Sequence, residues 1–497
     1  MEEKEIELFS LYDDEDYNNT STDSRLKPPI YNLNSNLNNP FLQIEEFYTL
    51  SHYESVETED IERLTIKYLT VEDIPVSKPG YIDLEKYCNP DLVQKMWGIK
   101  NQLGGHNRKN LIKARTSINP FEKIGKAIFQ NRAALKLANL DYLLYLIKKD
   151  RKCVFADICG GPGGFTEYIY WRKKGNAHGF GITLKCGDND WKLESFRNDA
   201  PHDNFIKLYG KDQTGDLTKN ENMKDFAKNV REQTNDKGVD IVVADGGFSV
   251  EENPNLQEIY LQQLILCQFL TMFTILNKGG SFVCKVFDLL HPFTVGLLYI
   301  LSANFEKFSI VKPYSSRPAN SEKYIVCQGL IERFPQDVLD YLFEINNRMN
   351  SSDLKNNNLH LQALVDESNF QNNGFLRFIQ NTNIRLIERQ IRFLGNFVQV
   401  LKKSSIHKIY DQVLMKEICL TRWNIPFEIP NSRKIQENLL TNSTDNNNKD
   451  TELKKRRVVR RRSSSNLQSS KNQGILGMNN DKLLQSVQQY LQKHKKK

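Results

Sequence analysis

Two lysines and two acidic residues stand where side chains of these types can do chemistry together. Lys285 lies inside the apolar run SFVCKVFDL, and a lysine is almost never fully buried unless an anion pairs with it. Asp245 follows the apolar run IVVA, which predicts a carboxylate at the edge of a sheet where such sheets bind ligands. Lys136 follows Arg132 by four residues, a repulsive helical spacing unless an acid such as Glu322 is near. Taken singly, each is more often a solvated or capping charge, while the opposite charges of Asp245 and Lys285 at neighbouring strand ends suggest a site.

A glycine-rich loop is the second candidate site. Asp157 lies near the end of the apolar run CVFADI, and the loop then leads into a predicted helix through Cys159, Gly160, Gly161, Pro162, Gly163, Gly164 and Phe165. Glycines let a backbone approach a ligand closely, and a helix N-terminus offers free N–H groups. The spacing does not fit a dinucleotide fingerprint, because Thr166 stands at its last glycine, and no Gly-Lys-Ser/Thr follows for a phosphate loop. We expect a nucleotide-like ligand of another kind, the alternative being a purely structural turn.

Short apolar runs alternate with helical patterns through the middle of the chain. Runs rich in Val, Ile and Phe predict strands buried on both faces at 153–158, 179–184, 241–244, 281–287 and 324–327. Between some of them the pattern predicts helices at 164–174 and 256–277. This alternation indicates an α/β doubly wound sheet with helices on both faces.

Further helices are expected on either side of this region. Asn119-Pro120-Phe121-Glu122 combines an N-cap, a proline at the first helical position and a capping-box glutamate, which predicts a helix start. The patterns at 334–349 and 375–401 have helical period and predict a C-terminal helical extension.

Composition and charge bound the class of protein. Of 497 residues, 39% are hydrophobic and 26% charged, as in globular proteins, and no apolar run reaches the roughly 18 residues that a membrane span needs. We therefore expect neither secretion nor a membrane partner. The 8 cysteines form no Cys-x-x-Cys motif, which indicates reduced thiols and no metal site.

The net charge of +7 is distributed unevenly. Residues 1–25 hold nine acids and two bases, whereas residues 451–497 hold thirteen bases and two acids. Seven of the nine residues at 454–462 are basic, a run typical of a nuclear-import signal or a nucleic-acid tether, and a short amphipathic helix is predicted at 482–492. We expect a nuclear location and an anionic partner.

The order and context of the four charges resemble the Lys-Asp-Lys-Glu tetrad of the FtsJ-like RNA ribose 2'-O-methyltransferases. The stretches NRAALKLANLD, FADICGGPGGFTEYIYWRKK, ADGGFSVEENPNLQEIY and KPYSSRPANSEKYIVC are further similar to the nuclear cap-specific mRNA 2'-O-methyltransferases that act on the first transcribed nucleotide. The similarity runs from about residue 87 to residue 426. It implies a Rossmann-like sheet that uses S-adenosylmethionine to methylate a ribose 2'-hydroxyl of 7-methylguanosine-capped mRNA, forming cap 1.

The resemblance also implies roles for individual residues. The tetrad would be Lys136, Asp245, Lys285 and Glu322, with Lys285 either the base or an orienting cation. Asp157 and the loop from Cys159 to Phe165 would contact the cofactor, with Asp216 and Leu217 near its adenosine. RNA or cap contacts are implied for Lys100, Arg115, Asn255, Leu256, Gln257 and Asn320. The predicted strand 179–184 ends in Thr183-Leu184, where an acid would often hold the cofactor ribose.

The expected organisation follows from these patterns together. It comprises a mobile acidic and Asn-rich region at 1–75, a helical segment lining the RNA site at 76–127, the methyltransferase domain at 128–331, the helical extension at 332–430 and a disordered basic tail at 431–497. The expected partners are capped mRNA and the transcription or capping machinery. The alternatives are a ribosomal or transfer-RNA 2'-O-methyltransferase with the same tetrad, or a non-catalytic RNA-binding protein on this fold.

Overall fold

The structure is a computed structural model. It describes residues 52–57, 66–81, 83–248, 250, 253–370, 374–402 and 410–426, all within the first of two compact units, Met1–Pro430. The acidic residues 1–25, the basic run at 454–462 and the short helix predicted at 482–492 lie outside the described residues.

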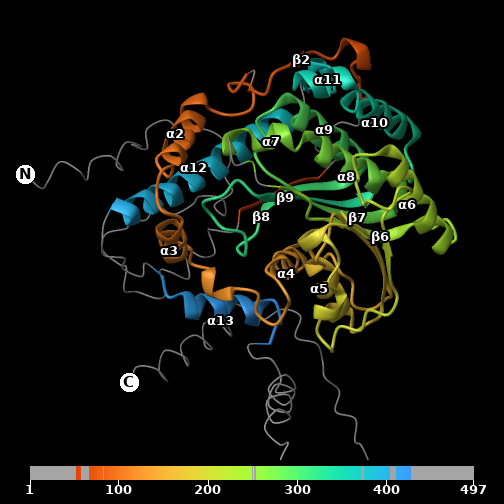
Figure 1. The fold of residues 1–497 in the computed structure, drawn as a ribbon, viewed down its shortest axis with the longest axis horizontal. Coiled ribbons are helices and arrows are strands. Elements are labelled where there is room, and N and C mark those ends of the chain that lie inside the picture. The colour runs from red at the N-terminus through yellow and green to blue at the C-terminus, as the bar shows by residue number, and fades with distance from the viewer. Residues whose placement is uncertain are drawn as a thin grey trace, which may run out of the picture. The chain divides into compact units, whose positions relative to one another are not determined.

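One mixed β-sheet forms the centre of the described chain (Figure 1). Its eight strands lie in the order β1-β8-β9-β7-β6-β3-β4-β5. Their bounds are β1 His52–Glu57, β3 Cys153–Ile158, β4 Ala177–Ile182, β5 Phe205–Leu208, β6 Val239–Ala244, β7 Leu276–Val286, β8 Phe305–Lys312 and β9 Lys323–Leu330. From β5 to β7 all neighbours are parallel, whereas β9 is antiparallel to both β7 and β8 and β1 is antiparallel to β8. A separate antiparallel pair joins β2 (Val76–Ser77) and β10 (His360–Leu361).

The predicted α/β sheet is confirmed, and all five predicted strands are present as β3, β4, β6, β7 and β9. Three strands of this sheet were missed, namely β1, β5 and β8, as was the short pair β2 and β10. β5 has only four residues, and β8 begins Phe-Glu-Lys-Phe, so its exposed charges interrupt the apolar run. Both β5 and β8 therefore lack the continuous apolar pattern that revealed the central strands.

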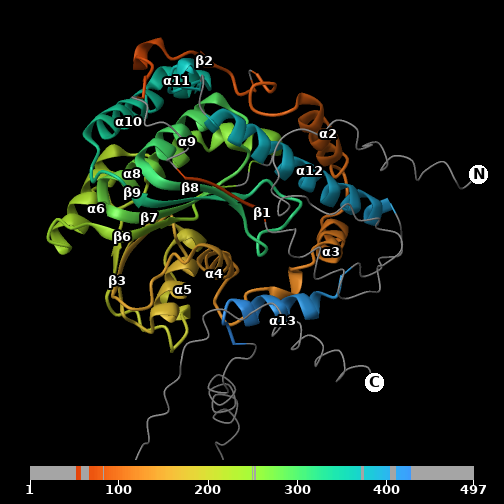
Figure 2. The ribbon, with the colours of Figure 1, turned by 180° about the vertical axis from the view of Figure 1, so that it is seen from behind.

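Helices cover both faces of the sheet. They are α2 (Pro90–Asn101), α3 (Arg108–Ile118), α4 (Ala133–Leu144), α5 (Gly164–Lys173), α6 (Asn220–Gln233), α7 (Gln257–Tyr260), α8 (Gln262–Ile275), α9 (Pro292–Asn304), α10 (Gln336–Met349), α11 (Ser352–Asn357), α12 (Gly374–Lys402) and α13 (Gln412–Arg422). Short 3₁₀ turns occupy Val71–Asp73, Glu122–Ile124, Gly187–Asn189, Leu193–Ser195, Pro254–Leu256 and Glu367–Phe370. In both ribbon views α4 and α5 lie on one side of the sheet, and α6, α8, α9 and α10 lie on the other (Figures 1 and 2).

Two helix predictions need correction. The helix predicted from Asn119 is a single 3₁₀ turn, although Asn119 and Glu122 do hydrogen-bond, because Gly125 ends the turn with φ of 57°. The helix predicted at 256–277 is divided into α7 and α8, and it ends at Ile275 because Leu276 is already extended and paired with β6. The helices predicted at 164–174, 334–349 and 375–401 are confirmed as α5, α10 and α12.

The long helix α12 holds the N-terminal helices to the rest of the molecule. It packs along α2 and α3, as both ribbon views show, while α13 packs on the 3₁₀ turn Glu122–Ile124 (Figures 1 and 2). The side-chain amide of Gln390 in α12 donates to the backbone oxygen of Ala319 at 3.2 Å and to Ser321 Oγ at 3.3 Å. α12 thus reaches the connection between β8 and β9.

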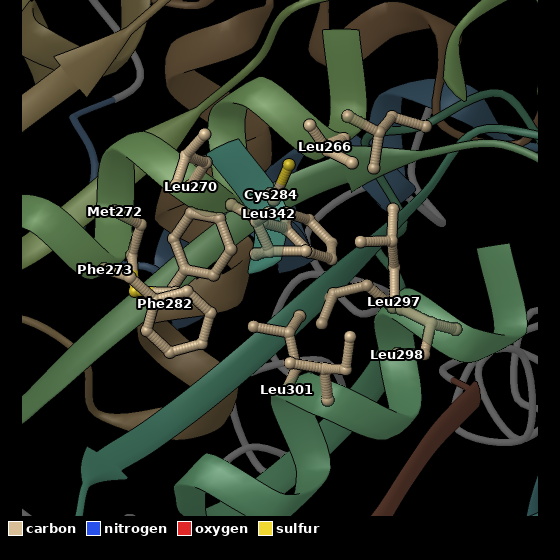
Figure 3. Packing of buried hydrophobic residues seen from close by; sticks show 14 of the residues in the cluster. Leu266, Leu270, Met272, Phe273, Phe282, Cys284, Leu297, Leu298, Leu301 and Leu342 are labelled. Carbon is tan, nitrogen blue, oxygen red and sulfur yellow. The ribbon is translucent and has the colours of Figure 1, made fainter. Parts of the chain in front are cut away.

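The main core lies between the sheet and the helices α8, α9 and α10. Leu270 and Phe273 from α8, Leu298 and Leu301 from α9 and Leu342 from α10 surround Phe282 and Cys284 of β7 (Figure 3). Within the described residues no single helix is long and apolar enough to cross a membrane, although the bent pair Pro254–Tyr260 and Gln262–Ile275 passes by length and composition alone.

Phe282→Ala tests the importance of this core. Phe282 is fully buried and meets the ring of Phe269 edge-on at 5.5 Å, so the substitution leaves a cavity. We expect the free energy of unfolding, measured by urea denaturation, to fall by about 3–5 kcal/mol. Lys228→Ala, on an exposed face of α6, should change it by less than about 0.5 kcal/mol. Equal effects of the two substitutions would contradict this assignment of the core.

Candidate active site

The sheet brings the four predicted charges to one edge. β6 ends at Ala244, so Asp245 lies directly at the carboxyl edge, and Ala244 pairs with Cys284 on the neighbouring strand, one residue before Lys285. β9 runs antiparallel, so Glu322, which precedes it, lies at the same edge as the strand ends. Lys136 comes from α4.

The four side chains form a connected network. Lys136 Nζ donates to Glu322 Oε2 at 2.8 Å and lies 3.9 Å from Asp245 Oδ2. Lys285 Nζ lies 3.3 Å from Asp245 Oδ1 and donates to the backbone oxygen of Asp245 at 2.6 Å. All four side chains are between 11% and 16% exposed, so the charges meet away from bulk water.

The electrostatics of the network keep one lysine and one acid charged. Burial opposes the ionised form of Lys136, but Asp245 and Glu322 overcome it and raise the pKa of this amine. Burial also opposes ionisation of Glu322, but Lys136, Lys285 and Lys312 lower its pKa to about 2. Lys136 and Glu322 are therefore a persistent ion pair at neutral pH.

Two residues that the sequence patterns did not reveal complete the network. The hydroxyl of Tyr324 donates to Asp245 Oδ1 at 2.7 Å, and its ring lies 5.7 Å from Lys136 Nζ. Lys312, at the end of β8, donates to Asn320 O at 2.8 Å, to Asn320 Oδ1 at 2.5 Å and to Glu322 O at 2.5 Å. Lys312 thus fixes the segment that carries Glu322. Lys312 ends a strand whose charged residues interrupt the apolar run, so no sequence pattern marked it.

The glycine loop lies beside this network. A Cβ on Gly246, next to Asp245, would come within 2.9 Å of Cys159 Cβ. Within the loop, a Cβ on Gly160 would collide with the Asp157 carboxylate at 2.1 Å, and one on Gly161 would meet Asn189 O at 1.8 Å. The loop therefore needs glycine at both positions.

Thr183 connects the glycine loop to the second predicted cofactor segment. The backbone N–H of Gly161 donates to Thr183 Oγ1 at 3.3 Å, and a Cβ on Gly215 would collide with Thr183 O at 1.7 Å. Asp216 follows, but its Oδ1 accepts from Thr218 N at 3.0 Å and from Thr218 Oγ1 at 2.8 Å, so this carboxylate shapes its own turn. Leu217 is buried.

Three of the predicted RNA contacts, Lys100, Arg115 and Asn320, lie around the four charges at this edge of the sheet, and we call them the rim. Lys100 Nζ donates to Ser321 Oγ at 3.2 Å and lies 3.9 Å from Asp288 Oδ2, so α2 reaches the segment that carries Asn320 and Glu322. Arg115 in α3 lies near Arg317 of that segment. Burial is the main cause that lowers the pKa of Arg115, and the positive charge of Arg317 lowers it further.

The predicted contacts Asn255, Leu256 and Gln257 form a separate group on the segment that enters α7. The hydroxyl of Tyr81 donates to Asn255 O at 3.0 Å, and its ring packs against Trp97 of α2 at 5.3 Å. The Gln257 amide donates to Phe248 O at 2.7 Å. This group is therefore linked to the helix that carries Lys100, but no contact joins it directly to the four charges among the described residues.

Two further residues next to the loop were missed. Gln130 Nε2 donates to Pro162 O at 3.1 Å, and a Cβ on Gly164 would lie 2.2 Å from Asn131 Oδ1. No sequence pattern marks either residue. In the part of the chain that the structure describes, no group of three or more His, Cys, Asp or Glu is placed to hold a metal ion.

Comparisons with known proteins agree with the motifs. Residues 129–330 match the family model described as FtsJ-like methyltransferase. The chain is 40% identical over 374 residues, 70% of its length, to a Dictyostelium discoideum protein named cap-specific mRNA (nucleoside-2'-O-)-methyltransferase 1, of which the match covers 48%. Proteins of the same name from Xenopus laevis and Homo sapiens are each 39% identical over 363 residues, 69% of this chain and 42% and 43% of theirs.

The chain spans about half the length of the curated relatives it matches. An FtsJ-like methyltransferase domain is present at residues 129–330, which confirms the resemblance drawn from the sequence motifs.

Asp157→Asn tests the electrostatics below the glycine loop. Asp157 is fully buried, and burial raises the pKa of its carboxyl to about 7. Between about pH 4 and that value the folded chain keeps a proton that the unfolded chain has released, so stability decreases as the pH rises. We expect the free energy of unfolding from urea titrations to fall across this window by roughly 2–4 kcal/mol more in the wild type than in Asp157→Asn.

The control is Asp150→Asn, at an exposed position. Its pH dependence should follow that of the wild type. Parallel curves for the wild type and Asp157→Asn would show that Asp157 does not retain its proton.

Proposed function

We propose that the chain transfers a methyl group from S-adenosylmethionine to the ribose 2'-hydroxyl of the first transcribed nucleotide of capped RNA. The single observation that carries the proposal is the convergence of Lys136, Asp245, Lys285 and Glu322 beside the glycine loop, at the edge of the sheet where parallel strands end. The FtsJ-like domain and the names of the relatives support the same reading.

The residues beside the loop fit S-adenosylmethionine. Side chains at Gly160 and Gly161 would collide with Asp157 and Asn189, so the tight path of the loop depends on glycine at both positions. Asp157 Oδ1 and Gln268 Nε2 are buried without hydrogen-bond partners, and a cofactor with an ammonium and a carboxylate could pair with such groups. The loop from Cys159 to Phe165 and Leu217 would hold the cofactor, which supplies an electrophilic methyl group when bound.

The chain's own residues must align the hydroxyl and take its proton. Lys285 Nζ donates to the backbone oxygen of Asp245 at 2.6 Å and lies 3.3 Å from its Oδ1, so this amine is held at the sheet edge where the hydroxyl would bind. There Lys285 would either accept the hydroxyl proton or orient the hydroxyl by its charge. Lys136, whose pKa is raised, stays an ammonium, so it would act by its charge and not as the base. Glu322 and Asp245 hold the two amines apart in fixed positions.

The RNA substrate is assigned to the rim that Lys100, Arg115 and Asn320 form beside the four charges. Lys100 and Asn320 belong to one network through Ser321 and Lys312, so a bound nucleotide would meet positions already fixed by hydrogen bonds.

We also propose a nuclear location, which rests on the basic run at 454–462 alone and which imaging of the full chain with and without that run would test.

The tetrad is tested by Lys285→Ala and Asp245→Ala. Both should abolish transfer, to below about one-thousandth of the wild-type rate, because each removes a group that orients or deprotonates the hydroxyl. Their affinity for the cofactor, measured by calorimetry, should stay within about threefold. Transfer is measured with labelled methyl donor on capped and uncapped RNA, followed by mapping of the modified nucleotide.

The matched control for the loss of a lysine is Lys228→Ala, which should retain wild-type transfer. Turnover by Lys285→Ala would refute the assigned base. Equal methylation of capped and uncapped RNA would replace the cap-specific function with a ribosomal or transfer-RNA methyltransferase.

Lys312→Met tests whether Lys312 positions the network. Without its three hydrogen bonds the Asn320–Glu322 segment loses its anchor, so we expect transfer to fall about tenfold or more with unchanged cofactor affinity. Adding Lys312→Met to Glu322→Gln should cost little further, because both act on one unit. Lys173→Met removes another buried amine that donates to three carbonyls, far along the chain from this segment, and should leave the transfer rate of the folded protein unchanged. Independent, multiplicative losses for Lys312 and Glu322 would contradict the positioning role.

A further inference from the structure

Glu122 lies among three arginines that come from different parts of the chain. Its Oε1 is 3.0 Å from Arg132 Nη1 and its Oε2 is 3.7 Å from Arg317 Nε. The Asn119 side-chain amide donates to Glu122 Oε2 at 2.6 Å. Burial acts to raise the pKa of Glu122, but Arg132, Asn119 and Arg317 outweigh it and lower that pKa. The carboxylate therefore stays charged and ties three segments together.

The charges around Glu122 do not balance. Arg115 of α3 completes the group, and the pKa of this guanidinium is lowered first by burial and then by Arg317, with Glu122 opposing. One carboxylate thus faces three guanidinium groups. The four residues are called the arginine cluster below.

Three nitrogen atoms of the arginine cluster lack an acceptor. Arg115 Nε, Arg132 Nη2 and Arg317 Nε are enclosed and have no hydrogen-bond partner. Buried donors of charged groups are rarely left unpaired in folded proteins, because the lost solvation is not recovered. An oxyanion shared by these arginines would supply both the missing acceptor and the missing negative charge.

The arginine cluster borders the four charges of the candidate active site. Arg132 precedes Lys136 by four residues, and residues at this spacing lie about 5–6 Å apart on one helix face. Arg317 belongs to the same segment as Asn320 and Glu322. In RNA a phosphate flanks each ribose on both sides, so a nucleotide whose hydroxyl meets Lys285 presents phosphates on either side of the four charges.

We propose that Arg115, Arg132 and Arg317, held in place by Glu122, form a binding site for an RNA phosphate next to the reacting ribose. The inference rests on the proposed function and deepens it. Of these three arginines, the sequence resemblance implied an RNA contact only for Arg115, whereas the structure adds the other two and the acid that arranges them. The phosphate belongs either to the bridge of the cap or to the first phosphodiester after the reacting nucleotide, and both present the same oxyanion.

The site is tested by the RNA affinity of Arg132→Gln, Arg317→Gln and Glu122→Gln at several salt concentrations. Each arginine substitution should weaken binding of capped RNA about tenfold and reduce the slope of log affinity against log salt by about one. Glu122→Gln adds positive charge, yet it should also weaken binding, because the arginines lose their shared anchor. Arg151→Gln, an exposed arginine before β3 at the opposite edge of the sheet, is the matched control and should leave affinity within about twofold.

Unchanged affinity and salt slope in Arg132→Gln and Arg317→Gln would overturn the phosphate site. Tighter binding by Glu122→Gln would overturn the role assigned to Glu122. All variants must retain wild-type cofactor affinity, which establishes that the fold is intact.

Two short ligands distinguish the source of the phosphate. Losses with both m7GpppA and m7GpppApG assign the site to the cap bridge, and losses confined to m7GpppApG assign it to the phosphodiester. Both outcomes support the site. Binding is measured without methyl transfer, so a wild-type protein that binds RNA through this site but methylates none would refute the proposed function and leave the phosphate site standing.

Discussion

The candidate active site depends on the pairing of four charges that are largely removed from water. Two amines and two carboxylates are enclosed at the sheet edge. Lys136 Nζ lies 2.8 Å from Glu322 Oε2, and Lys285 Nζ lies 3.3 Å from Asp245 Oδ1. Desolvation makes any one of these charges unfavourable alone, and only mutual pairing makes the group tolerable. The geometry of the four is therefore set collectively, which suits a site that must hold a weak nucleophile in line.

The direction of β9 makes this pairing possible. In a wholly parallel sheet the residue before a strand would lie at the opposite edge from the residues that end strands. Because β9 is antiparallel to β7 and β8, Glu322 precedes it at the edge where Asp245 follows β6. The connection from β8 to β9 also stays at this edge, where Lys312, Lys100 and Gln390 hold it from three elements. The antiparallel strand β9 thus places Glu322 beside the other three charges and keeps the β8–β9 connection at the same edge of the sheet.

The site and its surroundings differ in charge balance. The four catalytic candidates are neutral as a set, whereas the adjacent arginine cluster has three cations on one carboxylate. A neutral set of charges beside a cationic cluster matches the proposed RNA substrate, whose hydroxyl would react and whose phosphates would bind. The same contrast explains why the modest net charge of +7 for the whole chain is a poor guide to the partner.

The sequence by itself determined what is local. Short sequence patterns were enough to predict the buried central strands, the helices α5, α10 and α12 and the glycine loop. The period of apolar residues and the spacing of glycines are properties of short segments of sequence. Lys285 and Asp245 were detectable for the same reason, since Lys285 is a charge within an apolar run and Asp245 is a charge at the end of one. Short or charged strands such as β5 and β8 were missed. Leu276 was predicted to be helical from its local pattern, but it is extended because its pairing with β6 overrides that local preference.

Only the tertiary structure decided which of these residues meet. Lys136 and Glu322 are 186 residues apart in the chain, and Glu122 meets Arg317 only after the sheet, α4 and the β8–β9 connection are in place. The roles of Tyr324 and Lys312 are likewise visible only from their partners. Electrostatic pairing and hydrogen bonding depend on distances of a few ångströms, and a linear pattern specifies residue types and local period but not the distance between segments far apart in the chain.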